Sequence, residues 1–292
     1  MTSARPGFLE RLATRSAAVG TVLCLGLDPD PDALPSGFSR DVAGVEAFAR
    51  LVLEAAIPSV AAVKPNLAFF EAFGSAGIAA LERLRSAIPA DVPVVIDAKR
   101  GDIGSTAARQ AVALFDGLGA DAITVNPYLC EEAVRPLIDR ADRFAYVLCR
   151  TSNPGAGELQ SLVVSDAART GAPAEPLHVR VARRAAGWGP GGTVGLVVGA
   201  TAPAELVAIR AVAPGLAFLV PGVGAQGGDE ATVLESGPAT AAPAGGRPGG
   251  GLLVNVSRGI AAAAATRTGG ADLGESIASA ARDWAGRLPV LT

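Results

Sequence analysis

The chain has 292 residues, 50% of them hydrophobic and 18% charged, which predicts one large folded domain and excludes a disordered or fibrous protein. Its formal net charge of -3 excludes the broad basic surface of a nucleic-acid-binding protein. No apolar run is long enough to span a membrane, and the first residues carry arginines without an apolar stretch. We therefore expect a cytoplasmic protein with no membrane partner.

Three cysteines, Cys24, Cys130 and Cys149, lie singly in or beside apolar runs. Their odd number and unrelated spacings argue against a disulfide framework. We interpret all three as buried, reduced thiols, which agrees with a cytoplasmic location.

Eight short apolar runs, rich in β-branched residues, predict buried parallel strands along the chain. Helix-compatible segments alternate with them, and eight strand–helix units predict an α/β fold, a (β/α)8 TIM barrel, as a single domain over residues 1–292. The long connection over 151–190 predicts an added helical piece or a long lid. The expected strands are 22–27, 60–63, 94–96, 122–125, 145–148, 194–198, 217–220 and 252–256, and the expected helices include 45–56, 77–87, 106–118, 131–140, 176–186 and 204–213.

The second expected strand ends in Lys64, and Pro65 after it keeps this residue extended at the strand tip. The chain has 25 lysines and arginines, but only Lys64 and Lys99 are lysines, and both follow apolar runs. A lysine can give up its proton, whereas an arginine cannot. We therefore interpret the two lysines as functional, against the alternative of a composition biased toward arginine.

The third expected strand leads directly into Asp97, Lys99 and Asp102. Because side chains alternate along a strand, Asp97 and Lys99 share one face at its carboxyl end, where such barrels keep their active sites. A structural ion pair would also explain these two residues. Asp102 adds a second carboxylate, however, and repulsion between the carboxylates predicts a second cation nearby, for which Lys64 is the candidate.

The loops after the last two strands predict a phosphate site. The glycine-rich segment 221–228 exposes backbone N–H groups that can cradle an anion, and Arg258 follows the eighth strand. Between them, 229–251 is predicted to be a flexible insert within the domain, because residues 236–248 offer little apolar surface to bury. His178, the only histidine, is interpreted as a surface or packing residue. Because the chain has no other histidine, we exclude Ser–His catalysis and a histidine-rich metal site from the candidate functions.

The segment 97–106, DAKRGDIGST, resembles the central signature of the orotidine 5'-phosphate decarboxylase family, in its longer bacterial branch. The resemblance covers residues from about 21 to 260. It implies decarboxylation of orotidine 5'-phosphate to uridine 5'-phosphate in de novo pyrimidine biosynthesis, with no cofactor and no metal. Further matching segments, in the order that the family uses, are LGLDP at 25–29, KPN at 64–66, TSNPG at 151–155, PGVGAQGG at 221–228 and NVSRG at 255–259.

A decarboxylase without a cofactor must stabilise negative charge on the carbon that loses carbon dioxide, and an ammonium beside that carbon can do so and then deliver a proton. We expect Lys99 to be this group, in a charge network with Asp97, Asp102 and Lys64. The resemblance implies a homodimer with shared active sites, in which Asp102, Ile103 and Thr106 complete the site of the opposite subunit.

The resemblance further assigns the substrate contacts. Arg258 and Gln226 would hold the 5'-phosphate, Asp28 and Lys64 the ribose hydroxyls, and Ser152 the pyrimidine edge. The segments 151–155 and 226–228 are the expected lids.

Two alternatives belong to other functional classes. Sugar-phosphate decarboxylases and aldolases of the same barrel superfamily share the D-x-K-x-x-D spacing, but they would be expected to carry an acidic metal ligand on the second strand, where this chain has Lys64. A silent nucleotide-binding barrel would keep the phosphate loop and lose part of the charged network, and none of that network is missing. An assay of orotidine 5'-phosphate consumption with a chelator present distinguishes the cofactor-independent decarboxylase from these two alternatives.

Overall fold

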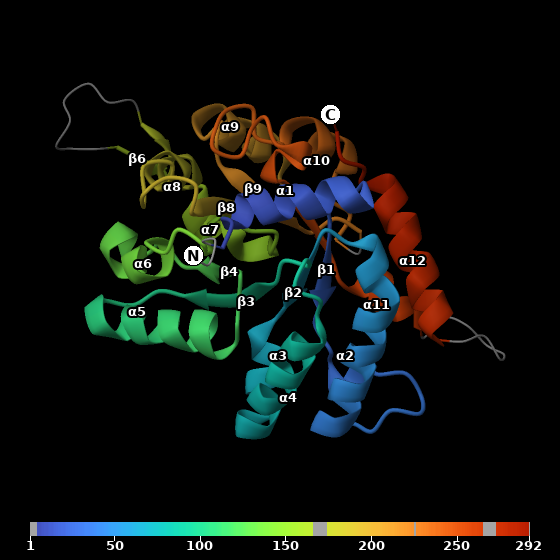
Figure 1. Ribbon diagram of the computed structural model, residues 1–292. Helices are drawn as coiled ribbons and strands as arrows, with labels where there is room; N and C mark the ends of the chain where they lie inside the picture. Colours follow the sequence, from blue (N-terminus) through green and yellow to red (C-terminus); the bar gives the residue numbers. More distant parts are fainter. Residues whose placement is uncertain (1–4, 166–173, 225, 265–272, 292) are drawn as a thin grey trace.

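The computed structural model describes residues 5–165, 174–224, 226–264 and 273–291, which form a barrel of parallel strands with helices around it (Figure 1). In this part of the chain eight strands form one sheet, in the order β2-β1-β10-β9-β8-β5-β4-β3. Bridges from Val63 to Val94 and from Asn66 to Asp97 close the sheet, which confirms the predicted (β/α)8 barrel. The barrel strands are β1 (Leu23–Leu27), β2 (Ala62–Pro65), β3 (Val95–Arg100), β4 (Ala122–Val125), β5 (Phe144–Arg150), β8 (Val194–Val198), β9 (Ala217–Pro221) and β10 (Leu253–Val256).

The expected helices are present, with one difference. Over 106–118, an α-helix that ends at Ala111 continues into a π-helical turn, Val112–Gly117. The expected helices correspond to α2 (Val42–Ala56), α4 (Gly74–Ala87), α5 (Gly104–Ala111), α6 (Cys130–Ile138), α8 (Leu177–Ala185) and α9 (Pro203–Val212). A helix expected to begin near Ile260 is α11 (Arg258–Ala261). Helices that the sequence analysis did not predict include α1 (Phe8–Val19), α3 (Leu67–Glu71), α10 (Glu230–Ser236) and α12 (Leu273–Arg287).

The first helix, α1, lies across the amino-terminal end of the strands (Figure 1). Its buried face includes Phe8, Leu9 and Leu12. Phe8 stacks on Phe144 with ring centroids 4.8 Å apart and meets the edge of Tyr146 at 6.0 Å. These contacts give α1 an aromatic anchor at the beginning of β5, so this end of the barrel is closed by packing.

Residues of the strands alternate between the inside of the barrel and the surrounding helices. In β3, Val95 belongs to the buried cluster that contains Phe8, whereas Ile96 belongs to the cluster that packs against the helices. The same alternation carries Asp97 and Lys99 to the inside at the carboxyl end of the strand. Both residues line one cavity there, as the sequence pattern predicts.

The stretch 229–251, expected to be a flexible insert, is more structured than its composition suggests. It contains α10, and both Ala239 and Ala244 are buried in the cluster at the amino-terminal end of the barrel. Gly251 has a φ of +68°, and a Cβ there would lie only 2.8 Å from the Cβ of Ala217. Small residues therefore bring this backbone into close contact with β9, a kind of burial that apolar content does not reveal.

The long connection after β5 contains added structure, as predicted. A 3-10 turn, Pro154–Ala156, leads into α7 (Gly157–Gln160), and β6 (Val163–Val164) pairs antiparallel with β7 (Glu175–Pro176). Residues 166–173 lie outside the described part of the chain. None of the described helices is long and apolar enough to cross a membrane.

Candidate active site

Three charged side chains meet inside the carboxyl end of the barrel. Lys64, on β2, places its Nζ 2.7 Å from Oδ2 of Asp97, and Lys99, on β3, places its Nζ 2.7 Å from Oδ1 of the same carboxylate. The side chains of Lys64 and Asp97 are 5% and 13% exposed, whereas that of Lys99 is 52% exposed. The expected second cation, Lys64, is present, and Lys99 is the more exposed of the two lysines.

Thr124, on β4, fixes Asp97 and Lys99 relative to each other. Its hydroxyl donates to Oδ1 of Asp97 at 2.8 Å and accepts from the backbone N–H of Lys99 at 2.9 Å. The strand register shifts between Ile96 and Arg100, and Lys99 has a φ of +47°, which residues other than glycine rarely adopt. Strained residues of this kind cluster at functional sites. The sequence analysis missed Thr124, for which the available signal was a hydroxyl within an apolar strand.

The electrostatics of the site keep Lys64 and Asp97 charged. Burial by itself raises the pKa of Asp97, but attraction and hydrogen bonds from Lys64 and Lys99 outweigh it and hold this pKa well below its ordinary value. Burial also lowers the pKa of Lys64, yet the charges of Asp97 and Asp28 outweigh it and leave this pKa raised. The pair therefore carries full charges at neutral pH.

Two adjoining cavities open onto these residues and share Lys64, Asp97 and Pro221. The first, of about 270 Å³, contains Lys99 together with the loop after β5. The second, of about 190 Å³, extends toward β1 and β10. The two cavities bring together seven of the predicted site residues: Asp28, Lys64, Asp97, Lys99, Ser152, Gln226 and Arg258.

Two buried acceptors line the smaller cavity without a donor. Oδ1 of Asp28 and Oδ1 of Asn255 have no hydrogen-bond partner among the described residues. Buried polar atoms are normally paired, so a ligand that supplies hydroxyl donors would satisfy both. Asn255 is a second residue that the sequence analysis did not single out.

The far end of the smaller cavity can hold an anion. Arg258 is exposed to it and has no ion-pair partner within the described part of the chain. Gly222 has a φ of +97°, and a Cβ there would lie 3.1 Å from both Oε1 of Gln226 and Cβ of Ser152. Ser152 donates its hydroxyl to that Oε1 at 3.2 Å. The glycine thus lets the loops after β5 and β9 approach each other beside an available guanidinium.

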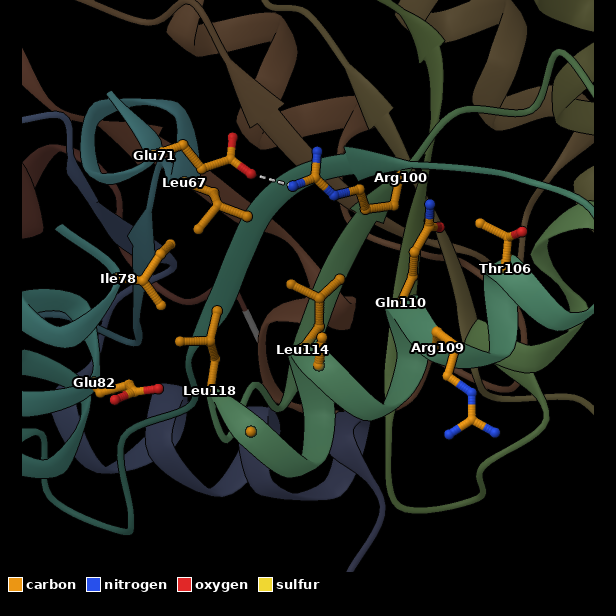
Figure 2. Close-up of a pocket in the computed structure, with 12 residues that line it drawn as sticks. Leu67, Glu71, Ile78, Glu82, Arg100, Thr106, Arg109, Gln110, Leu114 and Leu118 are labelled. Carbon is orange, nitrogen blue, oxygen red and sulfur yellow. Dashed lines mark hydrogen bonds and ion pairs between the residues drawn. The ribbon is translucent and has the colours of Figure 1, made fainter. Parts of the chain in front are cut away.

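Three predicted site residues, Asp102, Ile103 and Thr106, lie outside these two cavities. Oδ1 of Asp102 accepts from the backbone N–H of Ile103 at 2.7 Å, and Ile103 is 61% exposed. Thr106 lines a different, mainly apolar cavity of about 570 Å³ between α4 and α5, where Arg100 pairs with Glu71 (Figure 2). A single chain therefore does not bring these three residues to Lys99.

Two further predictions concern residues outside the site. His178, predicted to be a surface or packing residue, is buried, at 4% exposure. Cys24 and Cys149 are buried as predicted, and burial raises the pKa of each thiol to about 12. The prediction for Cys130 was wrong, because this residue is exposed at the beginning of α6, beyond the end of β4.

Comparisons with known proteins place the chain in a family. A family model described as "Orotidine 5'-phosphate decarboxylase / HUMPS family" matches residues 21–271. The orotidine 5'-phosphate decarboxylase of Thermomicrobium roseum is 47% identical over 277 residues, which cover 94% of this chain and 92% of that protein.

Two solved structures from Leishmania donovani share the fold. Its OMP decarboxylase is 38% identical with a TM-score of 0.77, over 96% of this chain and 97% of the other. Its UMP synthase is 39% identical with a TM-score of 0.81, and there the match covers 96% of this chain but only 55% of the other. The chain belongs to the orotidine 5'-phosphate decarboxylase family.

Proposed function

We propose that the chain decarboxylates orotidine 5'-phosphate to uridine 5'-phosphate without a cofactor or a metal, as a cytoplasmic enzyme of de novo pyrimidine biosynthesis. The observation that carries the proposal is the array of Lys64, Asp97 and Lys99 beside two adjoining cavities, the smaller of which also contains Arg258, which has no ion-pair partner among the described residues. Lysine, unlike arginine, can act as a proton donor, and these are the only two lysines in the chain.

The two adjoining cavities together suit a nucleotide that carries two anionic groups. Their lining contains three cations, Lys64, Lys99 and Arg258, against two carboxylates, Asp28 and Asp97. Arg258 and Gln226 would bind the 5'-phosphate, since a guanidinium forms strong charge-assisted bonds to phosphate. Asp28 and Lys64 would bind the ribose hydroxyls, which would supply the donor that Oδ1 of Asp28 lacks. Ser152 would then contact the pyrimidine edge.

The chemistry follows from where the charges lie. As carbon dioxide leaves, negative charge develops on the ring carbon, and the ammonium of Lys99 beside it stabilises this charge more than the ground state. Lys99 then donates its proton to that carbon. Asp97 holds the ammonium in place at 2.7 Å and disfavours the substrate carboxylate before it leaves. Lys64 keeps Asp97 ionised throughout.

We further propose a homodimer with shared active sites. Asp102, Ile103 and Thr106 lie outward from the site of their own chain, and Ile103 leaves a large apolar side chain exposed. In a symmetric dimer these residues would reach the cavity of the opposite subunit, where Asp102 would complete the charge network.

The activity is tested by following the absorbance of orotidine 5'-phosphate with purified protein and excess chelator. Consumption of the substrate with release of uridine 5'-phosphate and carbon dioxide is expected. Turnover that disappears with the chelator would contradict the proposal in favour of metal-assisted sugar-phosphate chemistry. Tight binding of uridine 5'-phosphate with no turnover would contradict it in favour of a silent nucleotide-binding barrel.

The shared site is tested with two inactive variants, Lys99→Ala and Asp102→Asn. After they are mixed, unfolded and refolded together, about half of the dimers are hybrids, each with one intact site, so activity should return to roughly a quarter of the wild-type value. A mixture no more active than its parents, with hybrids confirmed by native mass spectrometry, would place Asp102 and Lys99 in the same subunit's site.

A further inference from the structure

One buried histidine holds both ends of the segment that borders the reacting end of the cavity. This segment runs from 151 to 160, and Thr151, Ser152 and Asn153 line the cavity together with Lys99. His178, on α8, lines neither of the two cavities described above, although it is 4% exposed and lies directly behind the segment.

Hydrogen bonds between the first and last residues close the segment into a ring. Oε1 of Gln160 accepts from the backbone N–H of Thr151 at 2.9 Å, and Nε2 of Gln160 donates to Oγ1 of Thr151 at 2.8 Å. Oγ1 of Thr151 in turn donates to Oδ1 of Asn153 at 2.6 Å. The position of Thr151, and of Ser152 next to it, therefore depends on where Gln160 is held.

His178 holds Gln160 through its ring. Its Nδ1 lies 2.8 Å from the carbonyl oxygen of Gln160, which is the last residue of α7 and has no helical partner for that carbonyl. A carbonyl can only accept, so Nδ1 must carry the proton.

The backbone of His178 holds the other end of the segment. Its carbonyl accepts from Sγ of Cys149 at 3.1 Å, and Cys149 lies in β5, two residues before Thr151. His178 therefore links the strand before the segment to the helix that ends it.

We propose that His178 is a positioning residue for this active site, which it serves by fixing Gln160 and, through it, Thr151 and Ser152. The proposal rests on the proposed function, because Ser152 is assigned there to the pyrimidine edge. Ser152 also donates to Gln226 at 3.2 Å, so a shift of the segment would disturb the pyrimidine contact and the phosphate contact together.

Kinetics of three variants test the role. His178→Leu keeps an apolar side chain of similar size and removes the donor, and we expect kcat/KM to fall about tenfold, mainly through KM and weaker binding of uridine 5'-phosphate. His178→Asn offers an amide nitrogen near the position of Nδ1 and should restore most of the loss. Val179→Ala, the control, removes buried apolar atoms from the same helix and leaves the hydrogen bond intact, so its kinetics should match the wild type.

Two kinetic results would overturn the proposal. One is wild-type KM and kcat in His178→Leu. The other is an equal defect in His178→Asn, His178→Leu and Val179→Ala, which would assign the effect to helix packing.

A spectroscopic measurement separates this proposal from the proposed function. Because the chain has one histidine, a spectrum of protein labelled with ¹⁵N in histidine contains a single imidazole. The proposal predicts the tautomer protonated at Nδ1, with a slowly exchanging ring proton. An imidazole protonated at Nε2 alone would refute the role of His178 even in an active enzyme, whereas a chain without decarboxylase activity would refute the proposed function and leave this tautomer in place.

Discussion

The two ends of the barrel each hold a buried carboxylate, and different cations surround them. At the carboxyl end, Asp97 contacts two lysines, of which Lys99 is 52% exposed. At the amino end, the side chain of Asp121 is 1% exposed, and its Oδ2 accepts from the backbone N–H of Val94 at 2.8 Å. Four arginines approach this second carboxylate to between 2.7 and 3.8 Å: Arg5, Arg11, Arg85 and Arg143.

From the kind of cation at each carboxylate, we infer that the carboxyl end of the barrel carries out chemistry and that the amino end contributes to stability. An arginine keeps its charge at any physiological pH. Four arginines converge on Asp121, from α1, α4 and the loops before α1 and β5. Asp121 lines neither of the two cavities of the candidate site. A lysine can exchange its proton, and Lys99 faces a cavity. In barrels of this kind the carboxyl end carries the active site and the amino end contributes to stability.

The largest effect is expected from Lys99→Ala, which removes the proposed proton donor and the more exposed cation together. Turnover should fall by several powers of ten, each worth about 1.4 kcal/mol in the activation free energy, while binding of uridine 5'-phosphate largely remains. Steady-state kinetics and calorimetry measure the two quantities. Retention of even about a tenth of wild-type turnover would show that Lys99 is not the acid.

Arg258→Ala should act on binding rather than on the chemical step. Loss of a guanidinium that contacts phosphate is expected to raise KM about 100-fold, or about 2.7 kcal/mol, and to weaken the affinity for uridine 5'-phosphate by a similar factor. Uridine, which lacks the phosphate, serves as the control ligand and should bind the variant and the wild type alike. Unchanged affinity for uridine 5'-phosphate would remove Arg258 from the phosphate site.

Thr124→Val should have a smaller effect on activity than either Lys99→Ala or Arg258→Ala. The substitution keeps the shape of the side chain and removes the hydroxyl that joins Asp97 to the backbone of Lys99, so kcat should fall about tenfold. Thr124→Ser keeps the hydroxyl and is expected to restore most of this loss. If Thr124→Ser is as impaired as Thr124→Val, the defect arises from packing within β4 and not from the orientation of Asp97.

The candidate site at the carboxyl end was largely predictable from the sequence. Lys64 and Lys99 stand out because they are the only lysines and because each follows an apolar run, and strand alternation places Asp97 and Lys99 on one face. Thr124 and Asn255 were given no role in the sequence analysis, although Asn255 begins the matching segment 255–259, because a single polar residue within a strand has no distinctive spacing. Their roles depend on which neighbouring atoms lie within hydrogen-bond distance, and that distance is set by the closed barrel.

The amino end could not be predicted in the same way. The four arginines around Asp121 are spread over 139 positions of the sequence, and each resembles an ordinary surface residue in its own helix or loop. The stretch 229–251 was misjudged for a related reason, since Ala239 and Ala244 are buried by close backbone approach and not by large apolar side chains. Both features arise from contacts between distant segments, which local patterns do not encode.

The central claim, that one end of the barrel performs chemistry and the other stabilises it, is tested most directly by urea unfolding of Asp121→Asn beside Lys99→Ala, at one protein concentration and with kcat measured on each. Asp121→Asn leaves four guanidinium groups without their carboxylate, so it should lose about 3–5 kcal/mol in the free energy of unfolding and keep wild-type kcat when folded. Lys99→Ala should lose less than about 1 kcal/mol of stability, because its side chain is half exposed, and should be nearly inactive. A strongly destabilised Lys99→Ala, or a stable Asp121→Asn with low kcat, would contradict the account.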